Sequence, residues 1–384
     1  MDTITNPVRE RSPQGDRSTA VLGRAFSNGT SWHIYLKTED AWRSMKEACL
    51  NARTSIEIEQ YILERDTIGQ EFLELLIQKQ KEGVHIRVLC DMVGSYSLYA
   101  SDIPNALRHA GIEIRFFNVI KPWRLHTFFS WFFRDHRKVL IIDKSIGFVG
   151  GVGIRSDMKD WRDTHVKVHG TVVKEMGYAF EEMWETAGTE NFFRRMRRTN
   201  KFSRGFRFLT NSPLIRKRFI YQELISAIRS ARSYVYITTP YFIPDRRIKR
   251  VLRLAVKRGV DVRVLVPKQS NHIQADRAGR THFDSLLSGG VRIFLYTEEM
   301  LHAKTAVIDN EWATIGSFNL DSLSLFYNYE ANIISTKESF AEEVRSLFDR
   351  DMRKAHELTL TSWRSRSLYE KFHEWATFPY RRFL

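Results

Sequence analysis

Two segments of the chain carry the same pattern of residues that could perform phosphoryl chemistry. The pattern is HxKxxxxD, and its members are His136, Lys138 and Asp143 in the first copy and His302, Lys304 and Asp309 in the second. The copies lie 166 residues apart (302 − 136) at all three positions. A single His-x-Lys is a weak signal, but two copies in register indicate a pair of catalytic segments.

The two copies together predict substitution at a phosphorus centre without a metal or other cofactor. Side chains two residues apart on a strand point to the same face, so each histidine lies beside its own lysine. If pseudo-twofold packing joins the copies, one imidazole can attack phosphorus. The other can protonate the leaving oxygen and then deprotonate the incoming alcohol. The lysines would stabilise the charge on the non-bridging oxygens.

The other members of each copy have expected supporting roles. Asp143 and Asp309 count as motif residues of the candidate catalytic set, but each follows an apolar run at odd spacing. This position predicts that they end a strand and brace the neighbouring turn. The segments that follow are expected to bring backbone N–H groups and close approach to a phosphate oxygen. These segments contain Gly150 and Gly151 in the first copy and Gly316, Ser317 and Asn319 in the second.

Each half also places an acid well after its motif. Asp163 lies 27 residues after His136 (163 − 136), and Glu330 lies 28 residues after His302 (330 − 302). A carboxylate bonded to the far nitrogen of an imidazole would fix its tautomer and favour the imidazolium. The alternative is a surface acid at the start of a strand.

The elements that position these residues alternate between helix and strand. Periodicity predicts helices over 38–51, 71–81 and 104–109, and strands over 55–62, 84–90 and 112–117. Gly83 and Arg87 recur as Gly259 and Arg263, both 176 residues later (259 − 83). We therefore predict an α/β fold made of two duplicated α/β/α halves with central mixed sheets and the active site at their interface.

The expected organisation has five parts. They are a mobile arm over 1–30, a first half over 31–195, a basic linker over 196–212, a second half over 213–350, and an amphipathic basic and aromatic tail over 351–384. The first half contains about 13 extra residues, since the offset between the halves falls from 179 to 166. This insertion, at about 118–135, interleaves aromatic residues with cations, which fits contact with a lipid surface. The aromatic residues expected to contact the membrane are Trp123, Phe128, Phe129, Trp131 and Phe132. A buried core loop is the alternative.

Composition points to anionic partners. The 384 residues carry a net charge of +15, which favours an anionic phospholipid surface or, as the alternative, nucleic acid. No apolar run of about 18 residues occurs, so no membrane-spanning helix is predicted. The first residues lack the apolar core of a secretory signal, which predicts a cytoplasmic protein bound peripherally to the inner face of the cell membrane. The two cysteines, Cys49 and Cys90, lie in apolar runs and are expected to be buried free thiols.

These motifs resemble those of the phospholipase D superfamily, whose signature is two HxKxxxxD copies followed by Gly-Gly or Gly-Ser and Asn. The resemblance covers residues 35–345 and implies a metal-independent ping-pong reaction through a phosphohistidine. It also implies that His136 is the nucleophile and His302 the general acid and base. Several stretches, including Thr239 to Pro244 and Trp312 to Asp321, are most similar to bacterial cardiolipin synthases without transmembrane helices. Such enzymes transfer a phosphatidyl group from one phosphatidylglycerol to a second and release glycerol.

One position departs from the family pattern. Gly153 stands where the family has Asn, so Asn319 has no amide counterpart in the first half. Two other functions remain open on the sequence. One is a phosphodiesterase acting on lipid or nucleic acid, and the other is a membrane-binding protein without catalysis.

Overall fold

The computed structural model describes residues 30–120, 131–188, 205–213 and 218–367, together with Tyr369, Lys371 and Glu374. Several expected features lie outside these residues. They are the arm over 1–29, the membrane-contact candidates Trp123, Phe128 and Phe129, the linker over 196–204, and most of the tail after residue 367.

The first half of the chain folds around a seven-stranded mixed sheet with the order β1-β8-β7-β6-β2-β3-β4. Strands β2, β3 and β4 are parallel to one another, and the other neighbouring strands are antiparallel. The strands are β1 Ser31–Lys37, β2 Ser55–Gln60, β3 His85–Asp91, β4 Glu113–Phe117, β6 Lys138–Ile142, β7 Ile146–Gly150 and β8 Arg162–His169. The helices of this half are α1 Thr38–Leu50, α2 Thr67–Lys81, α3 Tyr96–Tyr99, α4 Ile103–His109 and α5 Val172–Gly188.

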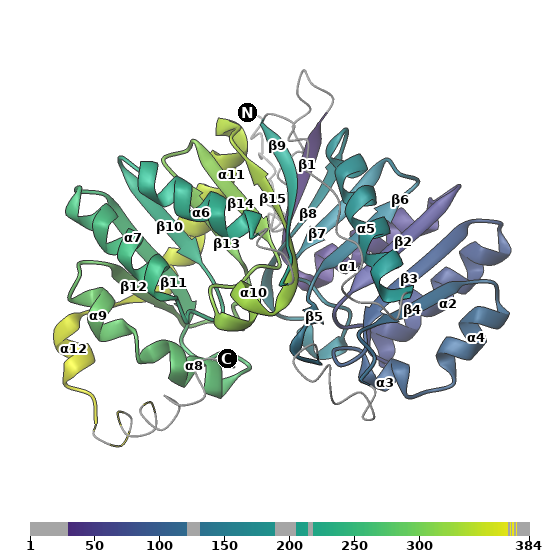
Figure 1. Cartoon of the computed structure of the whole chain (residues 1–384), viewed down its shortest axis with the longest axis horizontal. Coiled ribbons are helices and arrows are strands. Elements are labelled where there is room, and N and C mark those ends of the chain that lie inside the picture. Colours follow the sequence, from purple (N-terminus) through teal and green to yellow (C-terminus); the bar gives the residue numbers. More distant parts are fainter. Residues whose placement is uncertain are drawn as a thin grey trace, which may run out of the picture.

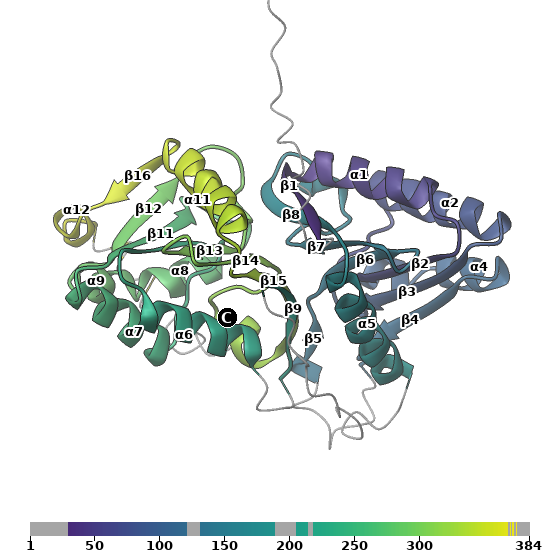
Figure 2. The same cartoon turned by 90° about the horizontal axis from the view of Figure 1, so that it is seen from above.

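The second half repeats this plan around a nine-stranded sheet, ordered β16-β12-β11-β10-β13-β14-β15-β5 with β9 also on β15. Its strands are β9 Phe206–Asn211, β10 Tyr234–Thr238, β11 Asp261–Pro267, β12 Arg292–Tyr296, β13 Thr305–Ile308, β14 Trp312–Gly316, β15 Asn328–Ser335 and β16 Ala355–Leu358. Its helices are α6 Phe219–Ser230, α7 Arg246–Lys257, α8 Ile273–Arg280, α9 Phe283–Leu287, α10 Ser322–Phe326, α11 Glu338–Met352 and α12 Leu360–Arg364. The two halves lie side by side in Figure 1 and Figure 2, which confirms the predicted α/β duplication.

The glycines that marked the repeat end equivalent helices. Gly83 follows α2 and Gly259 follows α7, with φ of +89° and +87°. Gly111 and Gly290 follow α4 and α9 in the same way, with φ of +88° and +81°. A side chain is strained in this left-handed region, so glycine is the residue that lets the chain leave a helix and enter the next strand.

The apolar side chains form one shared core and two outer cores. The shared core joins both sheets to α5 and α11, and it contains Val139 and Phe180 from the first half and Ile315 and Phe340 from the second. The outer cores lie beneath α1, α2 and α4 in one half and beneath α6, α7 and α9 in the other. Cys49 and Cys90 are buried free thiols, as predicted. Because the largest core belongs to both halves, the halves are fixed against each other.

Short strand contacts cross between the halves close to the motifs. The two-residue strand β5, Arg134–Asp135, comes from the first half but pairs in parallel with β15 of the second. In return, Arg162 on β8 forms a parallel bridge with Leu301, next to His302. Arg162 also donates to both oxygens of Asp351 on α11, at 2.9 and 2.6 Å. These crossings position each motif against the other half.

Two expected boundaries contain regular structure. The segment expected as a linker ends in β9, which pairs antiparallel with β15 along its full length. The segment expected as a tail begins with the last two residues of α11, continues into β16, which pairs with β12 as the edge strand, and then into α12. Both strands therefore extend the second sheet.

Candidate active site

Each motif histidine is held by the strand of the opposite half that carries an acid. The His136 backbone N–H donates to the Tyr329 carbonyl at 3.0 Å, and the His302 N–H donates to the Arg162 carbonyl at 2.8 Å. Tyr329 immediately precedes Glu330, and Arg162 immediately precedes Asp163. These two backbone hydrogen bonds are related by the same local twofold symmetry, so the two histidines enter one site from opposite sides.

The carboxylates are bonded to histidines across this interface. His136 Nδ1 lies 3.0 and 3.1 Å from the two oxygens of Glu330, and His302 Nδ1 lies 2.6 Å from Asp163 Oδ2. An ionised carboxylate only accepts, so Nδ1 carries the proton in both rings and Nε2 keeps its lone pair. Both acids therefore orient an imidazole, and each serves the histidine of the other half.

The two lysines are buried within the same centre. Lys138 Nζ donates to the His136 carbonyl at 2.7 Å, and Lys304 Nζ donates to the His302 carbonyl. Burial lowers the pKa of Lys138 to about 7, an effect that Glu330 opposes and the charge of Lys304 reinforces. Burial also lowers the pKa of Lys304 to about 8, although Asp163 and Glu330 oppose the shift. Asp163, which bonds His302, also raises the pKa of Lys138, and Glu330, which bonds His136, raises that of Lys304, so the two motifs form a single electrostatic unit.

Both histidines are neutral at pH 7 in this arrangement. Burial lowers the pKa of His136 below its usual range against the opposing charge of Glu330. Burial and the charge of Lys304 lower the pKa of His302 to about 3. Burial alone would raise the pKa of Asp163, but His302 and Lys304 lower it overall. The site therefore holds neutral imidazoles facing ionised Asp163 before an anion binds.

The two carboxylates have different surroundings. Glu330 accepts from Ser317 Oγ and, at 2.6 Å, from Ser324 Oγ. Asp163 accepts from the Thr164 N–H at 2.7 Å, and the residue equivalent to Ser317 is Gly151. The negative charge of Glu330 is thus shared among two hydroxyls and His136, whereas that of Asp163 is directed mainly at His302.

The glycines of the motifs allow neighbouring strands to approach closely. A Cβ on Gly151 would lie 2.2 Å from Asp163 Oδ1, and a Cβ on Gly316 would lie 2.1 Å from Asn332 Oδ1. A Cβ on Gly150 would lie 2.4 Å from the Thr164 carbonyl. The N–H groups of Gly151 and Ser317 already donate to the carbonyls of Thr164 and Ala331. These two N–H groups therefore already have a backbone acceptor, and the glycines bring neighbouring strands into close contact.

The motif aspartates brace turns at the far ends of their strands. Asp143 and Asp309 have φ of 50° and 54°, and each is the first of two consecutive left-handed residues in a tight hairpin. Asp143 accepts from the N–H groups of Arg53, Thr54 and Ser55. Asp309 accepts from the N–H groups of Arg232, Ser233 and Tyr234. Their place in the fold agrees with a bracing role at the start of β2 and β10.

The halves differ at the position of the family asparagine. Asn319 is buried, and its Nδ2 lies 3.4 Å from Ser324 Oγ. Its Oδ1 has no hydrogen-bond partner among the described residues. At the equivalent position, a Cβ on Gly153 would lie 3.2 Å from Met158 Sδ and 3.4 Å from Ile62 Cβ. The space that an asparagine would need in the first half is thus partly filled by Met158.

Aromatic rings that sequence reasoning missed flank the histidines. Tyr61 packs edge-on against His136 with ring centroids 4.8 Å apart, and Trp161 packs on His302 at 5.0 Å. Tyr241 lies 6.2 Å from His302. Tyr61 and Tyr241 occur just after the equivalent strands β2 and β10, so aligning the repeat residue by residue could have found them.

Of the expected membrane-contact residues, only Trp131 and Phe132 are described. Phe132 is 38% exposed, and the Trp131 carbonyl accepts from Arg134 Nη2 at 2.6 Å. Within the described ranges, no cluster of three or more His, Cys, Asp or Glu side chains is arranged to hold a metal ion. None of the helices in those ranges is long and apolar enough to span a bilayer.

Comparison with known proteins matches this chain to one family. The family model described as "Cardiolipin synthase, PLD-like domain" matches residues 45–184 and 224–352, one segment for each half. A cardiolipin synthase of Halalkalibacterium halodurans is 34% identical over 367 residues, which cover 92% of this chain and 72% of that protein. A cardiolipin synthase A of Pseudomonas fluorescens is 36% identical over 351 residues, covering 89% of this chain and 73% of the relative.

Solved structures share the fold at low sequence identity. A phosphatidylserine synthase of Haemophilus influenzae superposes with a TM-score of 0.70 at 14% identity, covering 92% of this chain and 95% of the other. A polyphosphate kinase of Porphyromonas gingivalis gives a TM-score of 0.62 at 13% identity, covering 91% of this chain and 53% of the kinase. At these identities the similarity concerns the fold alone.

Proposed function

The chain belongs to the cardiolipin synthase family of the phospholipase D superfamily of enzymes, and from this premise we propose the reaction that it performs. It transfers a phosphatidyl group from phosphatidylglycerol to the hydroxyl of a second phosphatidylglycerol. The products are cardiolipin and glycerol, and the intermediate is a phosphatidyl group bound to His136. No metal or other cofactor takes part in the proposed steps.

One observation supports this proposal above all: two histidines, each bonded through Nδ1 to the acid of the opposite half, share a site with two buried lysines. Each histidine presents Nε2 to the site as a lone pair. The two lysines supply positive charge where the non-bridging oxygens of a phosphodiester would lie. The arrangement thus contains a nucleophile, a group that can carry a proton, and two cations that can bind the phosphate oxygens.

In the first step, His136 Nε2 attacks phosphorus and the P–O bond to glycerol breaks. The leaving alkoxide takes a proton from His302, so glycerol departs as a neutral alcohol and the phosphatidyl group remains on His136. In the second step, His302 accepts the proton of the incoming hydroxyl. The resulting oxygen attacks phosphorus, and the P–N bond to His136 breaks.

The surroundings of the two acids support this division of roles. Glu330 divides its charge between His136 and two serine hydroxyls, so it orients His136 while leaving the imidazole neutral and nucleophilic. Asp163 lies 2.6 Å from His302 Nδ1, a distance suited to stabilising an imidazolium. His136 is also the more exposed of the two side chains, at 13% against 7%.

Substrate binding supplies the charge that the acid role of His302 requires. Without substrate, burial keeps the pKa of His302 near 3 and those of Lys138 and Lys304 near 7 and 8. A phosphodiester anion favours the protonated form of every group that faces it, so its arrival raises these pKa values. The enzyme would therefore gain protons on binding its lipid.

The lipid substrate implies work at a membrane surface. The net charge of +15 and the aromatic insertion at about 118–135, which includes the exposed Phe132, favour peripheral binding to an anionic bilayer. We propose the inner face of the cell membrane as the place of action.

The direct test incubates the purified chain with phosphatidylglycerol vesicles, with and without phosphatidylethanolamine, and identifies the lipid products by mass spectrometry. Cardiolipin and an equal amount of glycerol are expected from phosphatidylglycerol alone. Phosphatidic acid as the main product would identify a hydrolase instead. Salt-sensitive cleavage of DNA or RNA without lipid turnover would overturn the proposal in favour of a nuclease.

A further inference from the structure

The exposed large apolar side chains gather at one edge of the molecule. Nine such side chains occur among the described residues, and three of them lie apart on α1, α5 and α7. The other six are Val93, Tyr96, Tyr99, Phe132, Ile273 and Tyr369, with exposures of 43%, 61%, 36%, 38%, 51% and 72%. Helices α3 and α8 and the short strand β5 all lie along the lower edge in Figure 1. We call these six side chains the docking edge.

This edge is the one to which the active site belongs. Helix α3 begins shortly after the carboxyl end of β3, and α8 begins shortly after the carboxyl end of β11. His136 directly follows β5, and Tyr61 follows the carboxyl end of β2. The α8 end is connected to the site by ring contacts, because Tyr241 packs on His272 at 5.5 Å and on His302 at 6.2 Å. Ligands of open α/β sheets enter at the carboxyl ends of strands, so a substrate would enter across this edge.

Both halves contribute to the docking edge. Val93, Tyr96, Tyr99 and Phe132 belong to the first half, whereas Ile273 and Tyr369 belong to the second. A patch on one half alone would suit a small partner. Apolar side chains on both sides of the reaction centre suit a broad surface that meets both halves at once.

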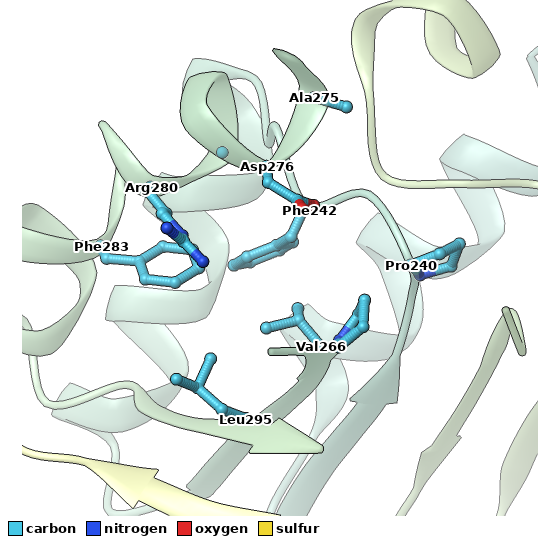
Figure 3. A pocket seen from close by; sticks show the side chains of 10 residues that line it. Pro240, Phe242, Val266, Ala275, Asp276, Arg280, Phe283 and Leu295 are labelled. Atoms are coloured by element: carbon cyan, nitrogen blue, oxygen red, sulfur yellow. The ribbon is translucent and has the colours of Figure 1, made fainter. Parts of the chain in front are cut away.

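Helix α8 has two distinct faces. Figure 3 shows Asp276 and Arg280 on its inner side, beside Phe242 and Phe283, above the strands that carry Val266 and Leu295. Ala275 and Ala278 are buried against the body of the protein. Ile273 and Arg277, one turn apart, line a second, outer hollow of about 290 Å³ with Lys268 and Tyr369, and Asp276 and Arg280 border both hollows. The outer face of α8 therefore offers apolar and cationic groups together.

The charged side chains on this outer face favour binding to an anionic surface. Asp276, which also borders the hollow, accepts from the Ser270 N–H at 2.8 Å, and Glu374 accepts from Arg366 at 2.5 Å. Among the described residues, no carboxylate forms an ion pair with Lys268 or Arg277. Cations beside inserted apolar side chains are the combination that binds anionic lipid headgroups, at about a fivefold gain in affinity for each cation.

From these observations we propose that the docking edge inserts into an anionic phospholipid bilayer, with α3 on one side of the active site and α8 on the other. Lys268 and Arg277 contact the headgroups. The site would then open directly onto the membrane that contains its substrate. This inference rests on the proposed lipid substrate, but vesicle binding can be measured without turnover.

The test compares two pairs of substitutions in vesicle sedimentation with equal amounts of phosphatidylglycerol and phosphatidylcholine. Tyr96→Ser with Ile273→Ser removes one apolar group from each half of the edge, and the partition coefficient should fall about tenfold or more. Leu50→Ser with Leu254→Ser removes groups of similar exposure, 50% and 43%, from α1 and α7. This control pair should stay within about twofold of the parent.

A second comparison tests the charges. Lys268→Gln with Arg277→Gln should weaken binding to the mixed vesicles and leave binding to pure phosphatidylcholine unchanged. Arg250→Gln with Lys257→Gln on α7 removes the same net charge away from the edge and should have the smaller effect on the mixed vesicles.

Three outcomes would overturn the inference. They are unchanged binding of the edge pair, equal losses in the edge and control pairs, and a changed oligomeric state of the edge pair with vesicle binding intact. In every variant, release of glycerol from a monomeric short-chain phosphatidylglycerol should equal that of the parent. If the parent releases glycerol from neither the soluble nor the vesicle lipid, the proposed function fails while the vesicle comparison still tests the docking edge.

Discussion

The Nδ1–H group of His136 donates a hydrogen bond to Glu330, which follows it by 194 residues and belongs to the other half of the chain. The reciprocal bond joins His302 to Asp163, 139 residues earlier. Each half therefore supplies one histidine and the acid that orients the histidine of its twin. Neither half alone holds a complete histidine–carboxylate pair, so activity requires that both pack together.

Replacing either histidine should abolish turnover. His136→Ala and His302→Ala are each expected to lower kcat by about a thousandfold or more, because one removes the nucleophile and the other the proton carrier. A rapid quench with labelled lipid should trap a phosphatidyl group on the parent and none on His136→Ala. Substantial activity in either variant, with an unchanged melting temperature, would remove the two-histidine mechanism.

Asp163 and Glu330, each bonded to the histidine of the opposite half, should affect kcat more than folding. Asp163→Asn and Glu330→Gln keep the shape of the side chain but lose its charge, and kcat should fall by about a hundredfold to ten-thousandfold. Asp157→Asn, at an exposed acid paired with Arg155, serves as the control and should leave kcat unchanged. If the two acid variants retain full activity, the carboxylates do not orient the imidazoles.

The buried lysines should set the alkaline limit of activity. A lysine is charged below its pKa, and those of Lys138 and Lys304 are lowered by burial to about 7 and about 8. As pH rises through this range the free enzyme loses positive charge, so kcat/KM for an anionic lipid should decline above about pH 7. Lys138→Met should lower kcat/KM and leave a decline near pH 8, measured with a short-chain soluble lipid. A profile that stays flat to pH 9.5 would contradict this account.

The motif aspartates should contribute to stability. Asp143 accepts from three backbone N–H groups and the Thr54 hydroxyl. These bonds lower its pKa overall, although burial opposes them. Asp143→Asn should cost about 1–2 kcal/mol of unfolding free energy at pH 7, with kcat per folded molecule unchanged.

The sign of the pH dependence follows from that lowered pKa. An acid with a depressed folded pKa stabilises the fold above its unfolded pKa, about 3.9, and loses this contribution as pH falls through the folded value. The stability difference between parent and Asp143→Asn should therefore shrink below about pH 4 in denaturant titrations. A difference that grows on acidification would exclude a bracing carboxylate.

The aromatic insertion should contribute more to membrane binding than to the catalytic reaction. Replacing the four residues Phe128, Phe129, Trp131 and Phe132 by Ser should weaken vesicle binding more than hydrolysis of a soluble short-chain lipid. Equal losses in the two assays would mean that these aromatic side chains belong to the core.

Features that follow from local rules can be predicted from the amino-acid sequence alone. The two HxKxxxxD copies, the alternation of strands and helices and the glycines after α2, α4, α7 and α9 are all set by a few neighbouring residues. Strand periodicity and the need for a left-handed residue act over such short distances. The prediction that Asp143 and Asp309 end a strand and brace a turn rests on the same kind of local pattern.

How the two motifs and their acids pack together depends on the three-dimensional fold. The near-equal spacings of Asp163 and Glu330 left open which histidine each acid would face, and the packing of the halves through β5 and β8 pairs them crosswise. The lowered pKa values of Lys138 and Lys304 depend on burial, which the motif does not encode. The Gly151 N–H donates to the Thr164 carbonyl on β8, a strand that lies beside it only in the folded sheet. Contacts between residues far apart in the chain arise from the packing of whole sheets, and no local pattern specifies them.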